Sequence, residues 1–112
     1  MLIVSFARTT EAFRDKSKTE TRRFWAPNHA KKFKPGVEFM GYTDDPRRHG
    51  EPIHPARVIL CYKELLGDMS DESFEREGGT RYWKNKAEYI EKMGGPNREV
   101  YVLRFDHIDT LF

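Results

Sequence analysis

The stretch that decides how this chain is interpreted is Ser17-Lys18-Thr19-Glu20-Thr21-Arg22-Arg23-Phe24-Trp25, in which charged, hydroxyl and aromatic side chains follow one another without interruption. If it is extended, as its β-branched threonines allow, side chains at positions 17, 19, 21, 23 and 25 share one face, and those at 18, 20, 22 and 24 share the other. Neither face is apolar before the terminal aromatics. The polar groups therefore need water, ionic partners or a ligand.

Two interpretations of this stretch follow. Alternating charge is typical of a solvated edge strand, which lysines and arginines protect from aggregation. The same groups are also those expected in a binding or catalytic site. The rest of the chain has to decide between them.

Length and composition predict a single domain over residues 1–112. The chain has room for one main core but not for two separate domains. Hydrophobic residues make up 38% of it and charged residues 34%, so the core must be lean. Aromatic residues, at 13%, are expected to supply much of the buried area.

Several site classes are not expected. The single cysteine, Cys61, cannot form an internal disulfide, and its apolar surroundings favour a packed side chain over a nucleophile. The four histidines lack metal-ligand spacing, so neither a metal site nor a cofactor is expected. The apolar run from Leu2 to Phe6 is too short for a signal peptide or a membrane span. A cytoplasmic protein, monomeric by default, is expected.

The distribution of charge is more informative than the formal net charge of +2. From Arg8 to Lys34, basic residues outnumber acidic ones by nine to three, whereas from Asp68 to Glu77 acids outnumber bases by five to one. This asymmetry indicates a site for an anionic or polar ligand with a carboxylate on one wall.

Hydrophobic periodicity predicts five strands, including the stretch quoted above. The other four are expected over Leu2–Phe6, Val37–Tyr42, Ala56–Leu65 and Glu99–Asp106, and the third of these is long enough to be bent or bulged. Because closure would remove exposed edges, the sequence predicts an α+β fold built on a mixed β-barrel of about five or six strands, with two or three helices packed over it.

Cap and breaker residues place the helices. Short helices are expected from Thr9 or Thr10 to about Lys16 and over His29–Phe33. A longer one begins after the N-cap Ser70 and ends at Gly78-Gly79, and another runs from the cap Thr80 to about Met93. The Thr43–Pro55 segment, rich in proline, is expected to be a surface loop, acting either as a lid or as an inert insertion.

Glu77 falls in the last turn of the acidic helix, where a carboxylate meets the negative end of the helix dipole. Solvation is the commoner reason for such a placement, and a functional role is the other.

Four segments in order resemble the ASCH domain family. They are Lys18-Thr19-Glu20-Thr21-Arg22-Arg23, then Phe33-Lys34-Pro35-Gly36, then the acidic helix ending Glu75-Arg76-Glu77-Gly78, then Val100-Tyr101-Val102-Leu103-Arg104-Phe105. The resemblance covers nearly the whole chain. It implies a PUA-like barrel that recognises RNA, a nucleotide or a modified nucleoside. Lys16 stands where the family usually has glycine.

One branch of small ASCH proteins consists of amidohydrolases that deacetylate N4-acetylcytidine. Resemblance to this branch implies Lys18 as proton acceptor, Thr21 as nucleophile and Glu77 as proton donor. Arg22, Arg23, Trp25, Lys16 and Ser17 are the candidate residues for binding substrate or nucleic acid. The alternative is a non-catalytic RNA-binding module, in which Arg22 or Arg23 holds phosphate or a base edge and Trp25 stacks on a base or packs in the core.

The catalytic interpretation makes two geometric demands. Lys18 and Thr21 lie three positions apart, on opposite faces of an ideal strand, so the segment must bend, bulge or begin as a turn at Lys18. A lysine acts as a base only when neutral, and an adjacent carboxylate would raise its pKa, so Lys18 and Glu77 are expected to face different sides of a substrate.

Overall fold

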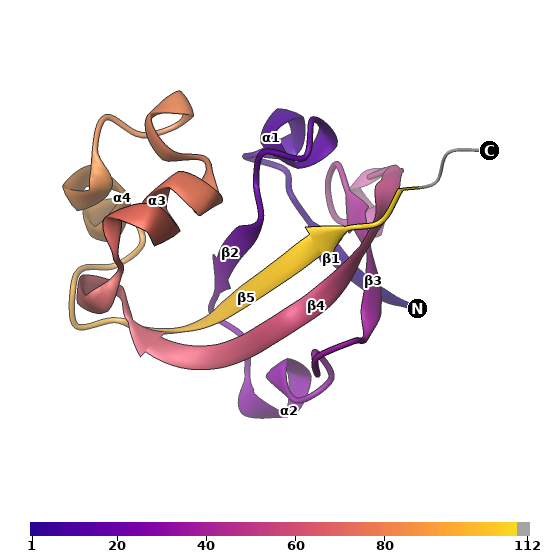
Figure 1. Ribbon diagram of the computed structural model, residues 1–112, viewed down its shortest axis with the longest axis horizontal. Coiled ribbons are helices and arrows are strands. Elements are labelled where there is room, and N and C mark those ends of the chain that lie inside the picture. Colours follow the sequence, from indigo (N-terminus) through magenta and orange to yellow (C-terminus); the bar gives the residue numbers. More distant parts are fainter. Residues whose placement is uncertain (110–112) are drawn as a thin grey trace.

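A five-stranded sheet curls around an apolar core in the computed structural model, which describes residues 1–109 (Figure 1). The strands are β1 (Leu2–Ser5), β2 (Glu20–Arg23), β3 (Glu38–Tyr42), β4 (Pro52–Leu65) and β5 (Glu99–His107). Their order across the sheet is β1-β3-β4-β5-β2. β1 runs parallel to β3, and the other neighbours are antiparallel. The predicted α+β class is confirmed.

The curl comes from the two long central strands. The pairing of β4 with β5 shifts register between Val58 and Leu60, which is the bulge expected from the length of this segment. β4 begins earlier than predicted, at Pro52. Its pairing with β5 reaches only Ala56, so Pro52 and Pro55 lie where the strand has a neighbour on one side alone, and prolines are tolerated there.

The sheet does not close into the predicted complete barrel. β1 and β2 are its two edges, and no backbone hydrogen bond joins them within residues 1–109. β2 is also much shorter than the stretch Ser17–Trp25, because only Glu20–Arg23 pair with β5. The architecture is a half-barrel with a seam between β1 and β2.

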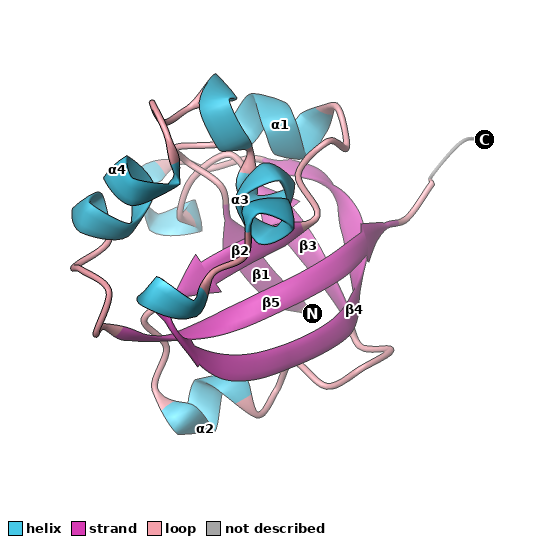
Figure 2. Ribbon diagram, turned by 60° about the vertical axis from the view of Figure 1, so that its left-hand side comes forward, coloured by secondary structure: helices cyan, strands magenta, loops and turns pink. Residues whose placement is uncertain are grey.

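Helices cover both sides of the curled sheet (Figure 2). α1 (Thr10–Arg14), α3 (Asp71–Glu77) and α4 (Lys86–Lys92) lie on one side, and α2 (Pro27–Ala30) lies on the other. Three 3-10 turns, Pro46–Arg48, Leu66–Asp68 and Gly79–Arg81, complete the described elements.

The predicted start of the last helix was wrong. Thr80 lies in the turn Gly79–Arg81, and α4 begins six residues beyond it, where the Asn85 side chain accepts a hydrogen bond from the Glu88 amide at 2.8 Å. By contrast, Ser70 caps α3 as expected, accepting from the Ser73 amide at 3.1 Å.

Two apolar clusters support the fold. The first fills the curl of the sheet, and the second lies beneath α3 and α4. The first contains Val4, Phe6, Phe13, Phe33, Phe39, Ala56, Val58, Leu103 and Phe105, and the second contains Leu66, Met69, Phe74, Tyr89 and Val100. Cys61 is half-buried against the first cluster, consistent with the predicted packing role.

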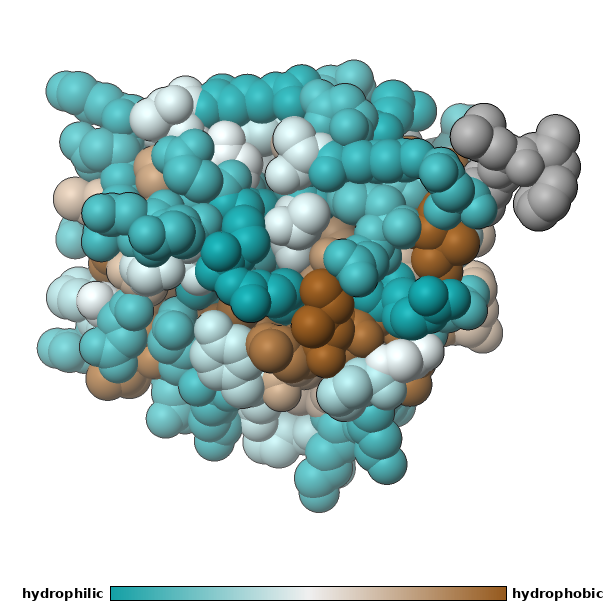
Figure 3. All heavy atoms as spheres, viewed as in Figure 1, coloured by the Kyte–Doolittle hydropathy of each residue, from teal (hydrophilic) through white to brown (hydrophobic). Residues whose placement is uncertain are grey.

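The surface is mainly hydrophilic in the view of Figure 3, where teal predominates and brown atoms gather near the centre and towards the right. Ile59 and Leu65 of β4 are among the exposed hydrophobic residues, at 40% and 39%. Across residues 1–109, every helix is too short or too polar to cross a membrane.

Candidate active site

A cavity of about 300 Å³ opens at the seam between β1 and β2. The chain leaving β1, the edge strand β2 and the helical side of the molecule all contribute to its wall. The lining residues are Ser5, Phe6, Ala7, Arg8, Thr9, Lys18, Thr21, Arg22, Arg23, Phe24, Glu77, Trp83, Tyr89 and Met93. The Thr43–Pro55 segment lies outside this lining, so the segment predicted as a lid or an inert insertion does not border the cavity.

Lys18 enters the cavity wall from a bend just before β2. Its main chain is fixed on both sides, because its amide donates to the Ala12 carbonyl at 3.0 Å and its carbonyl lies 2.7 Å from His107 Nε2. Its side chain is 2% exposed. Burial lowers the pKa of Lys18, while the neighbouring Glu77 carboxylate opposes that shift.

The bend meets the geometric demand set by the spacing of Lys18 and Thr21. β2 begins only at Glu20, so the alternation of an ideal strand does not apply across the pair, and both residues line the same cavity. Lys16 enters this bend with a φ of 72°, in the left-handed region that favours glycine. Lys16 is therefore one of the few residues other than glycine that adopt this conformation among residues 1–109.

Thr21 is 4% exposed, and its hydroxyl oxygen accepts a hydrogen bond from Arg23 Nε at 3.2 Å. Accepting this bond leaves its own hydroxyl hydrogen free to be donated. Within residues 1–109, no hydrogen bond joins Thr21 Oγ1 to Lys18 Nζ. Catalytic hydrogen bonds are often long before substrate binds, so this geometry is compatible with a nucleophile and its base.

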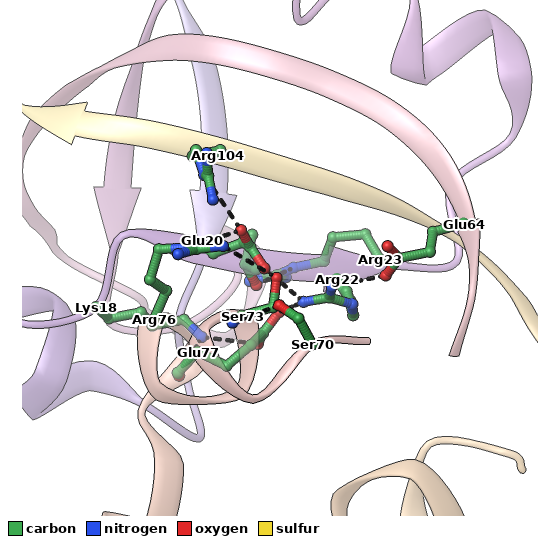
Figure 4. Close-up of polar contacts among 11 residues, drawn as sticks. Lys18, Glu20, Arg22, Arg23, Glu64, Ser70, Ser73, Arg76, Glu77 and Arg104 are labelled. Carbon is green, nitrogen blue, oxygen red and sulfur yellow. Dashed lines mark hydrogen bonds and ion pairs between the residues drawn. The ribbon is translucent and has the colours of Figure 1, made fainter. Parts of the chain in front are cut away.

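Glu77 is buried, at 2% exposure, so the solvated interpretation of its helix-end position is wrong. α3 ends immediately after it at Gly78, whose φ of 130° suits glycine. Lys18 Nζ donates to the Glu77 carbonyl at 2.6 Å and to its carboxylate at 3.1 Å (Figure 4). The expectation that Lys18 and Glu77 face different sides of a substrate is therefore wrong, because the buried Glu77 carboxylate has Lys18 as one of its two cationic partners, the other being Arg22.

Arg22 is committed to carboxylates and does not offer a free guanidinium to phosphate. Its Nη1 contacts Glu20 at 2.8 Å and Glu77 at 3.0 Å, and its Nη2 contacts Glu64 at 2.7 Å (Figure 4). The Arg22 side chain is fully buried, and its Nε has no partner among residues 1–109. The proposed phosphate contact is thus contradicted for Arg22.

Arg23 spans the seam instead. Its Nη2 donates to the Ser5 carbonyl at 2.6 Å, and its guanidinium lies 5.2 Å from the centre of the Phe6 ring. It is the predicted binding arginine that retains contact with the cavity without a carboxylate partner within residues 1–109.

Three predicted binding residues lie outside the cavity. Trp25 stacks on Phe33 at 4.3 Å between ring centres, which confirms the packing interpretation. Lys16 pairs with Asp109 at 2.7 Å, and Ser17 is exposed, with its hydroxyl 3.3 Å from the Ala12 carbonyl.

Sequence reasoning missed the residues that support this site from behind. Glu20, which is fully buried, accepts from Arg22, from Arg76 at 3.1 Å and from Arg104 at 3.3 Å. Burial tends to raise the pKa of Glu20, but hydrogen bonds from Ser73 and Arg22 outweigh it and lower the pKa. The sequence signal for this role of Glu20 was its position as a lone acidic residue between two threonines in a basic stretch.

A second supporting group is the histidine pair. His54 Nε2 lies 2.7 Å from His107 Nδ1, and His107 Nε2 lies 2.7 Å from the Lys18 carbonyl. Because a carbonyl only accepts, His107 must carry its proton on Nε2, and its Nδ1 then accepts from His54. Two histidines 53 positions apart give no sequence signal.

The described residues contain no group of three or more His, Cys, Asp or Glu side chains able to hold a metal ion. The functional groups of the residues that line the cavity include an amine, hydroxyls, a carboxylate and guanidinium groups.

Comparison with known proteins gives a structural likeness. No family model matches the chain, and no curated protein matches it. The fold is similar to the crystal structure of protein EF3133 from Enterococcus faecalis V583, family-model DUF984, with a TM-score of 0.63 and 13% sequence identity over 91% of this chain and 72% of that one. At this identity, the likeness supports the small half-barrel fold alone.

Proposed function

We propose that this protein is a PUA-like domain of the ASCH type that hydrolyses an amide on a modified nucleoside, with N4-acetylcytidine as the substrate. The observation that carries the proposal is the presence of Lys18, Thr21 and Glu77 on the wall of one cavity. Amide hydrolysis needs a nucleophile, a base and a proton for the leaving amine, and these side chains supply such groups.

The cavity suits a small molecule. Its volume of about 300 Å³ is at the lower end of the range for small-molecule sites, which fits a nucleoside better than a folded nucleic acid. Aromatic side chains of Trp83 and Tyr89 line it beside the polar groups, a combination that recognises a flat base.

Thr21 is the nucleophile in this proposal and Lys18 is its base. Burial, which lowers the pKa of Lys18, favours the neutral amine that a base requires. The hydrogen bond from the Arg23 guanidinium to Thr21 Oγ1 favours the developing alkoxide.

The non-catalytic RNA-binding alternative is less well supported. It assigned the phosphate or base-edge contact to Arg22 or Arg23, and three carboxylates occupy Arg22. Its candidate base platform, Trp25, stacks on Phe33.

Incubation with N4-acetylcytidine, followed by chromatographic separation of cytidine, tests the proposal. Thr21→Ala and Lys18→Met should each abolish nearly all turnover, and the double variant should cost little more, since members of one catalytic unit are not additive. Ser17→Ala, which removes an exposed hydroxyl from the same stretch, should retain full activity. Unchanged turnover in Thr21→Ala would refute the nucleophile, and nucleoside binding without turnover would favour the binding module.

A further inference from the structure

We propose that Lys18, and not Glu77, returns the proton to the leaving amine, while Glu77 remains a carboxylate throughout the reaction. This assignment rests on the amide hydrolysis proposed above. It differs from the proton-donor role that the family resemblance implies for Glu77.

Both carboxylate oxygens of Glu77 accept hydrogen bonds, which is the role of the ionised form. Lys18 Nζ lies 3.1 Å from Oε1 and Arg22 Nη1 lies 3.0 Å from Oε2. A guanidinium has donors and no acceptor, and it stays charged at any ordinary pH. A proton on Oε2 would therefore face an N–H group, and the 2% exposure of Glu77 leaves little access to water that could accept it instead.

The contacts of Lys18 suit both of its forms. A neutral amine has two N–H groups and one lone pair, and Lys18 Nζ has two acceptors, the carbonyl and the carboxylate of Glu77. The third position on the nitrogen is the lone pair in the amine and a third N–H in the ammonium. Because Lys18 lines the cavity, it can accept a proton and give it back while both contacts to Glu77 persist.

The charged groups around the pair come from three elements. Lys18 is faced by Glu77 of α3 and by Arg22 and Arg23 of β2. Tyr89 of α4 lies near Glu77, and burial together with that carboxylate raises the pKa of Tyr89, so its phenol stays neutral. Glu77 thus neutralises the Lys18 ammonium when it forms, and Arg22 balances Glu77 when Lys18 is neutral.

The reaction balances with this one proton carrier. Thr21 Oγ1 loses its proton to neutral Lys18 and bonds to the acetyl carbon. The C–N bond then breaks as the Lys18 ammonium protonates the amine, which leaves as cytidine. A water molecule next gives a proton to Lys18 and attacks the acetyl ester. The ester C–O bond breaks, Lys18 returns the proton to Thr21, and acetate leaves after losing its proton to solvent.

Two measurements on the intact protein test the assignment. The pH dependence of turnover should rise through one ionisation, that of Lys18, to a plateau. Carbon NMR of protein with labelled glutamate carboxyl and lysine Cε groups should show Lys18 titrating at the midpoint of that rise, with no accompanying change in the Glu77 carboxyl signal. Glu77→Gln and Lys18→Met identify the two signals.

The variants separate a functional from a structural role. Glu77→Gln removes the anion that favours the ammonium, so the midpoint should move to lower pH while the profile keeps its single rise. Glu75→Gln, an exposed neighbour on α3, should leave the midpoint where it was. If Glu77→Gln does not fold, the glutamate signal of the unmodified protein still decides.

A Glu77 carboxyl that protonates at the pH of a second, descending limb would overturn this assignment and leave the hydrolase standing. Absence of turnover in the unmodified protein would overturn both proposals.

Discussion

At the scale of single residues, Glu20 makes three ion pairs within residues 1–109, as many as Arg22. Three arginines contact its carboxylate, and one of them, Arg22, also holds Glu77. Glu20 thereby connects β2 and β5 to the helix that presents the candidate site. Removing a fully buried carboxylate from between its cations strongly destabilises a protein. This holds even where replacing the whole ionic network with apolar residues would leave the stability unchanged.

Glu20→Gln should lower the free energy of unfolding by about 3 kcal/mol, because it leaves buried guanidinium charge without its anion. Urea denaturation measures the change. Glu11→Gln is the matched control, since Glu11 pairs with Arg14 at 3.6 Å on the exposed surface and such pairs contribute less than about 1 kcal/mol. Equal stabilities of the two variants would show that the network does not contribute as its burial implies.

The histidine pair makes stability depend on pH. Burial, then the neighbouring His107 and Lys16, lower the pKa of His54 to about 4. A group whose pKa is lower in the folded than in the unfolded protein contributes stability above its unfolded value, and that stability is lost as pH falls through the folded value. The window therefore runs from about 6.5, the reference value, down to about 4.

Over that window, the unfolding free energy should fall by roughly 2 kcal/mol more than in His54→Gln, which keeps a donor to His107 without titrating. Denaturation at a series of pH values gives both curves. His49→Asn, on the exposed turn, should follow the unmodified protein. Parallel curves for the protein and His54→Gln would contradict the assigned role.

At the scale of elements, the sequence predicted best those helices and strands whose bounds are set by residues close to them in the chain. β5 and the β4 bulge follow from hydrophobic pattern and length, and α3 follows from a cap and a glycine stop. The extent of β2 was wrong because only pairing with β5 defines it, and that partner lies about 80 positions along the chain. The cavity membership of Lys18, Thr21 and Glu77 came from a family resemblance, whereas their mutual contacts depend on tertiary packing that no spacing encodes.

The difference between the predicted and the observed start of α4 can be tested by substitutions at the two candidate cap residues. Asn85→Ala should destabilise the protein by about 1 kcal/mol, because it removes the acceptor for the Glu88 amide. Thr80→Ala should change stability by less than about 0.5 kcal/mol, since Thr80 is exposed and does not cap the helix. Thermal or urea unfolding of the two variants compares the positions directly, and a larger effect at Thr80 would restore the sequence-based boundary.

At the scale of the whole molecule, stability is divided between the core inside the curl and the smaller cluster beneath α3 and α4. The first includes Phe39, which is fully buried and lies 5.4 Å from Phe105, ring centre to ring centre. Phe24, by contrast, is 51% exposed. The same residue type thus occupies opposite environments in one chain.

Phe39→Ala should cost about 3 to 5 kcal/mol, through lost burial and the cavity that remains. Phe24→Ala should cost less than about 1 kcal/mol, because much of its ring already meets water. Denaturant unfolding compares the two variants. Similar decreases in their free energies of unfolding would mean that the core inside the curl does not contribute most of the stability.

The seam between β1 and β2 differs from the other strand boundaries in how its two edges are held together. At the four other boundaries, neighbouring strands are joined by ladders of backbone hydrogen bonds, so separating those strands means unfolding the sheet. Across the seam, the contacts described above are those of the Arg23 guanidinium with the Ser5 carbonyl and with the Phe6 ring. A hydrogen bond from a charged group such as the first contributes about 1.5 to 3 kcal/mol. Within residues 1–109, side chains and not a ladder of backbone hydrogen bonds therefore hold the two edges together where the cavity opens, so a substitution at Arg23 changes the seam without removing any strand pairing.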